Sequence, residues 1–330
     1  MTNFIGIDEA GYGPNLGPLV VGATAWWGLG DRSDAGDEGV VDLYERLVGV
    51  VSAEADEGCV AIADSKVLYK PRGGLRLLER GVLTGLGIVG RLDGDGGWQE
   101  FWEATGADAE RRRLELPWYA GFDCALPIDA EAREIVGLRE FFRAGCETAN
   151  VELHDMQARA VFPKEFNELT EHHGTKGAAL SHVSIALLKE ALENLNPSPQ
   201  PLAPTHITCD KHGGRNRYGA LLQHHFPDEW IETIQESRPI SQYRWGPQES
   251  RVTVTFRTKG EAELPTALAS MVAKYHRELA MRAFNAYWAE QVDDLRPTAG
   301  YPQDAKRFKE EIAAKQRELG IDDRMLWRNR

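Results

Sequence analysis

The sequence has few cysteines and no pattern that would pair them. Four occur in 330 residues, namely Cys59, Cys124, Cys146 and Cys209, and their spacing is typical of neither a disulfide framework nor a zinc site. The N-terminal residues lack the basic and apolar pattern of a secretory signal. No apolar run approaches the ~20 residues that a membrane span needs. We therefore expect a cytoplasmic protein with reduced thiols and no membrane partner.

Basic side chains are also fewer than acidic ones. Lys and Arg number 38 against 51 Asp and Glu, and the formal charge of −13 argues against general binding to polyanions. The deficit is uneven, because residues 1–60 hold eleven acidic and two basic side chains, whereas residues 200–285 hold nine acidic and eleven basic ones. A local basic region can still bind nucleic acid when the total is negative.

The sequence has no internal repeat and no low-complexity tail. Strand-like and helix-like segments alternate, which is typical of an α/β fold. The loop between the first two strands is too short for a parallel crossover, so we expect a hairpin and a mixed sheet. Residues 91–150, rich in Trp, Pro and Gly, indicate an insertion or lid within a single domain over residues 1–330. The expected strands are 3–8, 17–27, 205–210 and 251–259, and the expected helices are 41–53, 73–86, 162–173, 181–195 and 265–292.

The stretch FIGIDEAGYGPNLGPLVVGA at residues 4–23 combines two acids with several glycines. A glycine-rich phosphate loop would open a helix whose N-terminus receives the anion, but here a strand pattern follows. Asp8 and Glu9 would also repel a phosphate. No G-x-x-x-x-G-K-[ST] loop occurs in the chain. The sequence thus disfavours a nucleotide loop.

A carboxylate site explains the same stretch better. Asp8 and Glu9 end one predicted strand, Asp210 ends another, and Glu278 lies on the longest predicted helix. Each acid taken alone is better explained as a surface charge or a helix cap, and only the group as a whole indicates a site. Carboxylates that cluster are all ionised only when a cation neutralises them, and oxygen ligands favour Mg²⁺ or Mn²⁺. Two such ions about 4 Å apart can activate a water and stabilise the leaving oxygen of a phosphodiester.

Several motifs carry a family resemblance. GIDEAGYGP followed by GPLVV resembles the opening of type 2 ribonuclease H (ribonuclease HII), G-x-D-E-A-G-R-G and then G-P-[LV]-V. Type 3 ribonuclease H shares this opening more distantly. Further motifs follow in the family's order: DSKVL at 64–68, ITCD at 207–210, KGEAELPTALASMVAKYHRE at 259–278 (like K-[GA]-D…A-A-S-I-x-A-K-x-x-R-D), GYPQD at 300–304 and RMLW at 324–327. Only residues 91–150 lack a counterpart.

The resemblance implies a ribonuclease H-like mixed sheet flanked by helices, with a helical C-terminal portion. It also implies a monomeric, Mg²⁺- or Mn²⁺-dependent endoribonuclease. Its substrate would be the RNA strand of RNA/DNA hybrids, or ribonucleotides embedded in duplex DNA, and it would leave 5′-phosphates. The resemblance assigns catalysis and metal binding to Asp8, Glu9, Asp210 and Glu278. Substrate contacts would come from Gly11, Tyr12, Gly13, Ser65, Lys66, Ser270, Lys274, Arg277 and Tyr301.

Two residues depart from the family pattern. Tyr12 stands where the family has a basic residue, and Glu278 stands where it has Asp. Residues 211–217 also differ from the usual continuation. These departures leave two alternatives open: a ribonuclease H-fold nuclease that acts on another structured nucleic acid, and a non-catalytic nucleic-acid binding module.

Overall fold

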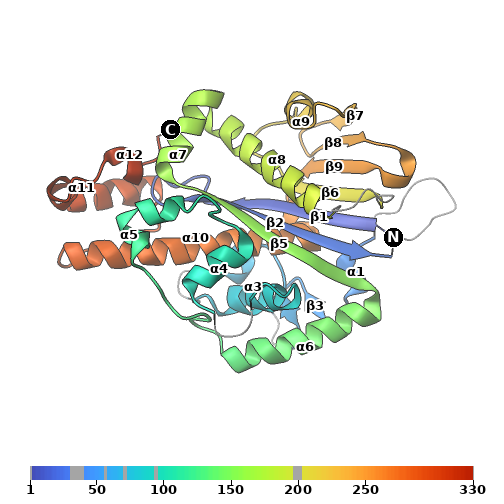
Figure 1. Cartoon of the computed structure of the whole chain (residues 1–330), viewed down its shortest axis with the longest axis horizontal. Coiled ribbons are helices and arrows are strands. Elements are labelled where there is room, and N and C mark those ends of the chain that lie inside the picture. Colours follow the sequence, from blue (N-terminus) through green and yellow to red (C-terminus); the bar gives the residue numbers. More distant parts are fainter. Residues whose placement is uncertain are drawn as a thin grey trace.

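The computed structural model describes residues 2–29, 41–55, 58–69, 73–92, 96–195 and 203–329. Its centre is a seven-stranded sheet in the order β5-β2-β1-β6-β9-β8-β7 (Figure 1). β1, β6 and β9 run parallel, and the other neighbouring strands pair antiparallel. The strands are β1 (Thr2–Ala10), β2 (Leu19–Gly28), β5 (Val151–Val161), β6 (Thr205–Asp210), β7 (Glu232–Glu236), β8 (Ile240–Trp245) and β9 (Val252–Arg257), with a separate pair of β3 (Val51–Ser52) and β4 (Val60–Ala61).

Helices cover both faces of the sheet, as Figure 1 shows with α8 on one side and α10 and α3 on the other. Each face has its own apolar cluster, because β1 alternates its side chains: Ile5 and Ile7 belong to one cluster and Phe4 to the other. The helices are α1 (Leu43–Arg46), α2 (Ser65–Leu68), α3 (Arg76–Ile88), α4 (Trp98–Thr105), α5 (Pro117–Ala120), α6 (Ala132–Ala149), α7 (Pro163–His173), α8 (Lys176–Leu195), α9 (Gly219–His225), α10 (Leu264–Gln291), α11 (Pro302–Glu318) and α12 (Asp323–Leu326). Short 3₁₀ turns are η1 (Arg112–Glu115), η2 (Gln248–Ser250) and η3 (Gly260–Ala262).

Two glycines let the N-terminal half of α10 lie directly on the sheet. A Cβ built on Gly6 of β1 would stand 2.1 Å from the backbone of Pro265, and one on Gly22 of β2 would stand 2.3 Å from the Ala269 carbonyl oxygen. Thr24 fixes the same approach, since its hydroxyl donates to the Pro265 carbonyl at 2.7 Å. This contact fixes the position of α10 relative to the end of β1.

The structure confirms the predicted fold class, a mixed sheet flanked by helices. It also confirms the hairpin of β1 and β2, and the predicted strands and helices at the other positions except one. The expected helix over residues 41–53 is wrong, because only Leu43–Arg46 is helical and Val51–Ser52 pairs in parallel with Val60–Ala61. Gly49, three residues beyond the end of this helix, adopts φ +80°, which a continuing α-helix would not allow.

The segment expected to be an insertion or lid contributes to the core where it is described. Trp98, Phe101 and Trp102 of α4 are buried, and the Phe101 ring stacks on His276 of α10 at 4.1 Å between centroids. Residues 93–95 of this segment lie outside the described residues. The aromatic residues that make it look irregular in sequence therefore pack it against α10.

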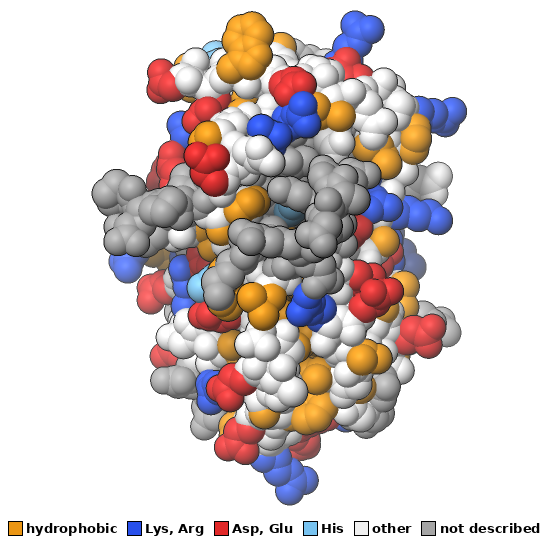
Figure 2. All heavy atoms as spheres, turned by 90° about the vertical axis from the view of Figure 1, so that its right-hand side faces the viewer, with side chains coloured by type: hydrophobic (Ala, Val, Ile, Leu, Met, Phe, Trp, Pro, Cys, Tyr) orange, Lys and Arg blue, Asp and Glu red, His pale blue; other side chains and the backbone are white. Residues whose placement is uncertain are grey.

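The net negative charge is not gathered on the face drawn in Figure 2. Acidic and basic side chains alternate over this face with no broad area of one sign. No described helix is long and apolar enough to cross a membrane.

Candidate active site

Three of the predicted carboxylates meet at the ends of two parallel strands. Asp8 and Glu9 lie at the end of β1, and Asp210 is the last residue of β6. The strands are in register with Ile7 opposite Cys209, so Asp8 and Asp210 follow side by side. The carboxyl ends of strands are where sites collect in α/β folds.

A fourth carboxylate, which our sequence prediction did not include, joins this group. Glu261 lies in η3, directly after β9, which is the next parallel strand beyond β6. The backbone N–H of Gly260 donates to Asp210 Oδ1 at 3.1 Å and ties the turn to the acid. Lys66 Nζ lies 3.5 Å from Glu261 Oε1. Asp8, Glu9, Asp210 and Glu261 are called the carboxylate cluster from here on.

The pKa values of the cluster show how closely the acids face one another. The pKa of Asp8 is raised well above its usual range by burial and then by repulsion from Glu9 and Asp210. Burial and Asp210 raise the pKa of Glu9 to about 7, against the opposing effect of Lys66. The pKa of Asp210 is also raised, by burial and by Glu261, although hydrogen bonds from Gly260 and Lys211 oppose this. Such a cluster favours a cation.

Lys66 supplies positive charge beside the cluster while remaining exposed. Its side chain is 78% exposed and lies 3.9 Å from Asp64 as well as near Glu261. Partial burial lowers its pKa, but Asp64, Glu261 and Asp8 outweigh this and raise it overall. Lys66 is therefore protonated at neutral pH and accessible to an anion.

Two serines connect α2 and α10 beneath the cluster. The hydroxyl oxygens of Ser270 and Ser65 lie 3.1 Å apart, within hydrogen-bond distance, and both side chains are buried. A hydrogen bond from Ser270 also lowers the pKa of Asp8, in opposition to burial. Ser270 thus lies beside Asp8, and Ser65 contacts Ser270.

The structure does not bring Glu278 to the cluster. Glu278 lies eight residues beyond Ser270 on α10, roughly 12 Å along the helix axis. Its carboxylate accepts from the Tyr69 hydroxyl at 2.7 Å and pairs with Lys274, whose Nζ lies 4.5 Å from the centroid of the Tyr69 ring. Glu278 and Lys274 form a local pair beside Tyr69.

Arg277 lies inside the protein under the turn that follows Glu9. It is 3% exposed, and its guanidinium donates to the carbonyls of Pro18 at 2.7 Å and Ala299 at 3.0 Å. Gly11 makes room for it, because Gly11 has φ +87° and a Cβ there would stand 2.7 Å from Arg277 Cδ. The expected phosphate contact by Arg277 is therefore replaced by a positioning role. Arg328 stabilises the same turn, because its guanidinium donates to the Gly11 carbonyl at 2.6 Å.

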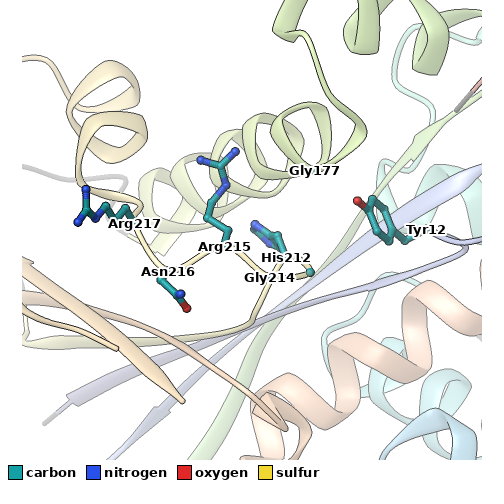
Figure 3. Close-up of a pocket in the computed structure, with 8 residues that line it drawn as sticks. Tyr12, Gly177, His212, Gly214, Arg215, Asn216 and Arg217 are labelled. Carbon is teal, nitrogen blue, oxygen red and sulfur yellow. The ribbon is translucent and has the colours of Figure 1, made fainter. Parts of the chain in front are cut away.

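Tyr12, Gly13 and Tyr301 line the surface next to this turn. A Cβ on Gly13 would meet only the Tyr301 ring, at 3.8 Å, and Tyr301 is 58% exposed. Tyr12 is half-buried and faces a pocket of about 530 Å³ that it shares with Gly177 and residues 212–217 (Figure 3). These three predicted positions are thus accessible to a large ligand.

The donor chemistry of the cluster fits a hard divalent cation. Glu261 Oε2 is buried and has no hydrogen-bond partner among the described residues, which leaves an anionic oxygen for an ion to ligate. Within those same residues, no three His, Cys, Asp or Glu side chains already lie close enough together to hold a metal ion. By type alone, these oxygen donors fit Mg²⁺ or Mn²⁺.

A signal for Glu261 was present in the sequence. The family motif K-[GA]-D aligns with Lys259, Gly260 and Glu261, and the acid of that motif falls on Glu261. We assigned the fourth acid to the R-D end of the same motif, which falls on Glu278. Sequence spacing alone could not choose between Glu261 and Glu278. The choice depends on how η3 folds back toward Asp210.

The fold and the strand-end carboxylates define a class of protein: an α/β protein with a candidate site of clustered acidic residues. Among solved structures, the chain is similar to one from the PCNA:RNase HII complex of Archaeoglobus fulgidus. The two share 17% sequence identity with a TM-score of 0.40, and the match covers 99% of this chain and 94% of that one. The chain is also similar to ribonuclease H2 from Pyrococcus horikoshii, with 16% identity and a TM-score of 0.41 over 98% of this chain and 92% of that one. It is similar as well to Bst-RNase HIII in complex with Mn²⁺, with 14% identity and a TM-score of 0.40 over 99% of this chain and 66% of that one. At these scores the likeness carries no argument about function.

No protein-family model matches the chain, and a search of curated proteins finds no match.

Proposed function

We propose that this protein is a metal-dependent endoribonuclease of the ribonuclease H type. Its substrate would be the RNA strand of an RNA/DNA hybrid, or a ribonucleotide embedded in duplex DNA, and the product would carry a 5′-phosphate. The observation that carries the proposal is the meeting of Asp8, Glu9, Asp210 and Glu261 at the ends of three parallel strands. The motifs that resemble ribonuclease HII supply all four of these acids and Lys66.

The four acids would hold the cofactor. Two Mg²⁺ or Mn²⁺ ions, when bound, would activate a water and stabilise the leaving oxygen of the phosphodiester. Burial, and then repulsion among the acids, raises the pKa values of Asp8, Glu9 and Asp210, so a divalent cation would both neutralise and organise them. Ser270 and the Gly260 N–H orient Asp8 and Asp210 toward one another.

The substrate would be held by exposed groups around the cluster. Lys66 is the cation nearest to Glu261 and would contact a phosphate oxygen. Tyr301 and Gly13 lie beside the turn after Glu9, where an exposed ring can pack on a sugar or base. Arg277 would not contact the substrate but would stabilise this turn, because it donates hydrogen bonds to the carbonyls of Leu16 and Pro18.

Asp210→Asn is the direct test. The amide keeps the shape and the ability to accept the Gly260 N–H, but it removes a charge that a cation needs. We expect cleavage in Mg²⁺ or Mn²⁺ to fall by at least about a hundredfold, with the unfolding temperature unchanged or raised. The measurement uses two labelled duplexes, one with a single ribonucleotide in DNA and one a continuous RNA/DNA hybrid.

The outcomes separate the candidate functions. Near-normal cleavage by Asp210→Asn would remove the metal mechanism. Wild-type protein that binds both duplexes and cuts neither would favour the non-catalytic binding module. Cutting of another structured nucleic acid alone would favour the second nuclease alternative.

A further inference from the structure

The pocket beside Tyr12 is lined by three segments distant in sequence, and Arg215 and Arg217 of one of them give it positive charge. Tyr12 comes from the turn after β1, Gly177 from the start of α8, and residues 212–217 from the loop after β6 (Figure 3). In the close-up, the Tyr12 ring and the Arg215 side chain lie on either side of His212 and Gly214. Gly177 has no side chain to fill the space: a Cβ there would stand 3.5 Å from the Tyr12 hydroxyl.

Two cations flank the Tyr12 ring. Lys176 Nζ lies 5.1 Å from the centroid of the ring, a cation–π distance. On the loop side, Arg215 lowers the pKa of Tyr12, whereas burial and Glu9 raise it more strongly. Glu9 of the carboxylate cluster and Arg215 of the loop therefore both act electrostatically on the Tyr12 hydroxyl.

Arg215 is the better anion contact of the two loop arginines. Arg217 lies 3.6 Å from Glu236, which offsets its charge. Arg215 has no carboxylate within salt-bridge distance among the described residues, and its half-buried guanidinium lies 6.0 Å from the centroid of the Tyr218 ring. The loop itself is anchored, because buried Lys211 donates to the Asn216 side chain at 3.1 Å and to the Ser237 carbonyl at 2.8 Å.

We infer that Lys176 and Arg215 together replace the basic side chain missing at position 12, and that their pocket binds one phosphodiester of the nucleic-acid strand next to the cleavage site. The Tyr12 ring separates this phosphate from the carboxylate cluster and packs on the adjoining sugar. This inference rests on the proposed function for the kind of ligand, and it concerns binding rather than cleavage. Lys176 and Arg215 would thus be substrate-binding residues, outside the carboxylate cluster.

The test measures binding without cleavage. Fluorescence anisotropy with both labelled duplexes, in EDTA and in Ca²⁺, gives the dissociation constant at several salt concentrations. We compare wild type with Lys176→Gln, Arg215→Gln and the double variant. Arg143→Gln is the matched control, because Arg143 is an exposed cation on α6, far in the fold from this pocket.

We expect the double variant to bind both duplexes about 10-fold more weakly at low salt, and the slope of log K against log salt to fall by about one. Arg143→Gln should bind like wild type. Inorganic phosphate should compete only at millimolar concentration, because the pocket would hold the phosphate as part of a longer strand.

Three results would overturn the inference. These are an unchanged salt slope in the double variant, an equal loss in Arg143→Gln, or no binding of either duplex by wild type. Failure of the proposed function looks different. If only the proposed function fails, the wild-type protein binds the duplexes in EDTA and the double variant binds them more weakly, but neither Mg²⁺ nor Mn²⁺ leads to cleavage.

Discussion

At the residue scale, Glu261 and Glu278 differ in what their carboxylates face. Glu261 faces Asp210, Glu9 and exposed Lys66 and keeps one oxygen without a hydrogen bond among the described residues. Both oxygens of Glu278 already have partners, the Tyr69 hydroxyl and the Lys274 ammonium. An acid whose oxygens are engaged in this way is poorly available to a cation.

The two glutamates therefore give a matched pair of variants. Glu261→Gln should reduce metal-dependent cleavage by about a hundredfold or more, because it removes a ligand charge. Glu278→Gln should retain activity within about threefold and lower the unfolding temperature slightly, since a half-buried ion pair is worth only about 1 kcal/mol. Cleavage rates at saturating Mg²⁺ decide between them. The reverse order of activities would restore Glu278 as the fourth acid.

At the element scale, the contact of α10 with β1 sets the position of Ser270 beneath Asp8. Gly6→Ala should disturb it, because the new Cβ would meet the backbone of Pro265, which cannot turn away. We expect a loss of at least about 2 kcal/mol in unfolding free energy, the usual cost of overpacking or more. Urea denaturation measures this.

Gly137 is the control for this substitution. It lies exposed on α6, where a Cβ would meet nothing within 4 Å. Gly137→Ala should leave the stability unchanged or raise it by up to about 1 kcal/mol, through helix propensity. Equal stability of Gly6→Ala and Gly137→Ala would show that α10 adjusts freely on the sheet.

Sequence patterns predicted elements where the apolar period was long. The strand at Thr205–Asp210 and the helix at Leu264–Gln291 are examples, and both deliver residues to the site. Residues 41–53 misled us, since their apolar spacing suits a helix but Gly49 and the pairing of Val51 with Val60 interrupt it. Asp8, Glu9 and Asp210 could be predicted from strand ends. Glu261 could not, because its place depends on the fold of η3 against Asp210.

At the scale of the whole molecule, buried neutral histidines couple stability to pH. His212 lies on the α8 side of the sheet and His276 on α10, and burial lowers the pKa of each to about 3. Above about pH 6.5 neither the folded nor the unfolded chain protonates them, so they have no effect. As the pH falls from 6.5 toward 3, the unfolded chain binds protons that the native chain does not, and stability decreases.

His276→Gln isolates one of these contributions. Its overall stability is expected to be lower, because His276 contacts the Thr105 hydroxyl at 2.8 Å. The fall in stability between pH 7 and pH 5 should nevertheless be shallower than in wild type, by about 1–2 kcal/mol. Urea midpoints at pH 7, 6 and 5 give the comparison. Parallel curves for the two proteins would mean that His276 takes up protons equally in both states.

The buried guanidinium of Arg328 joins the turn after Glu9 to a residue 317 positions later in the chain. A ribosome that adds about 5–20 residues per second reaches Arg328 roughly 15–60 s after it has made Gly11. During that interval the nascent polypeptide already carries Asp8 and Glu9, but it lacks the side chain that fixes the neighbouring loop. The order of translation therefore leaves this turn without its Arg328 contact until residue 328 has been added.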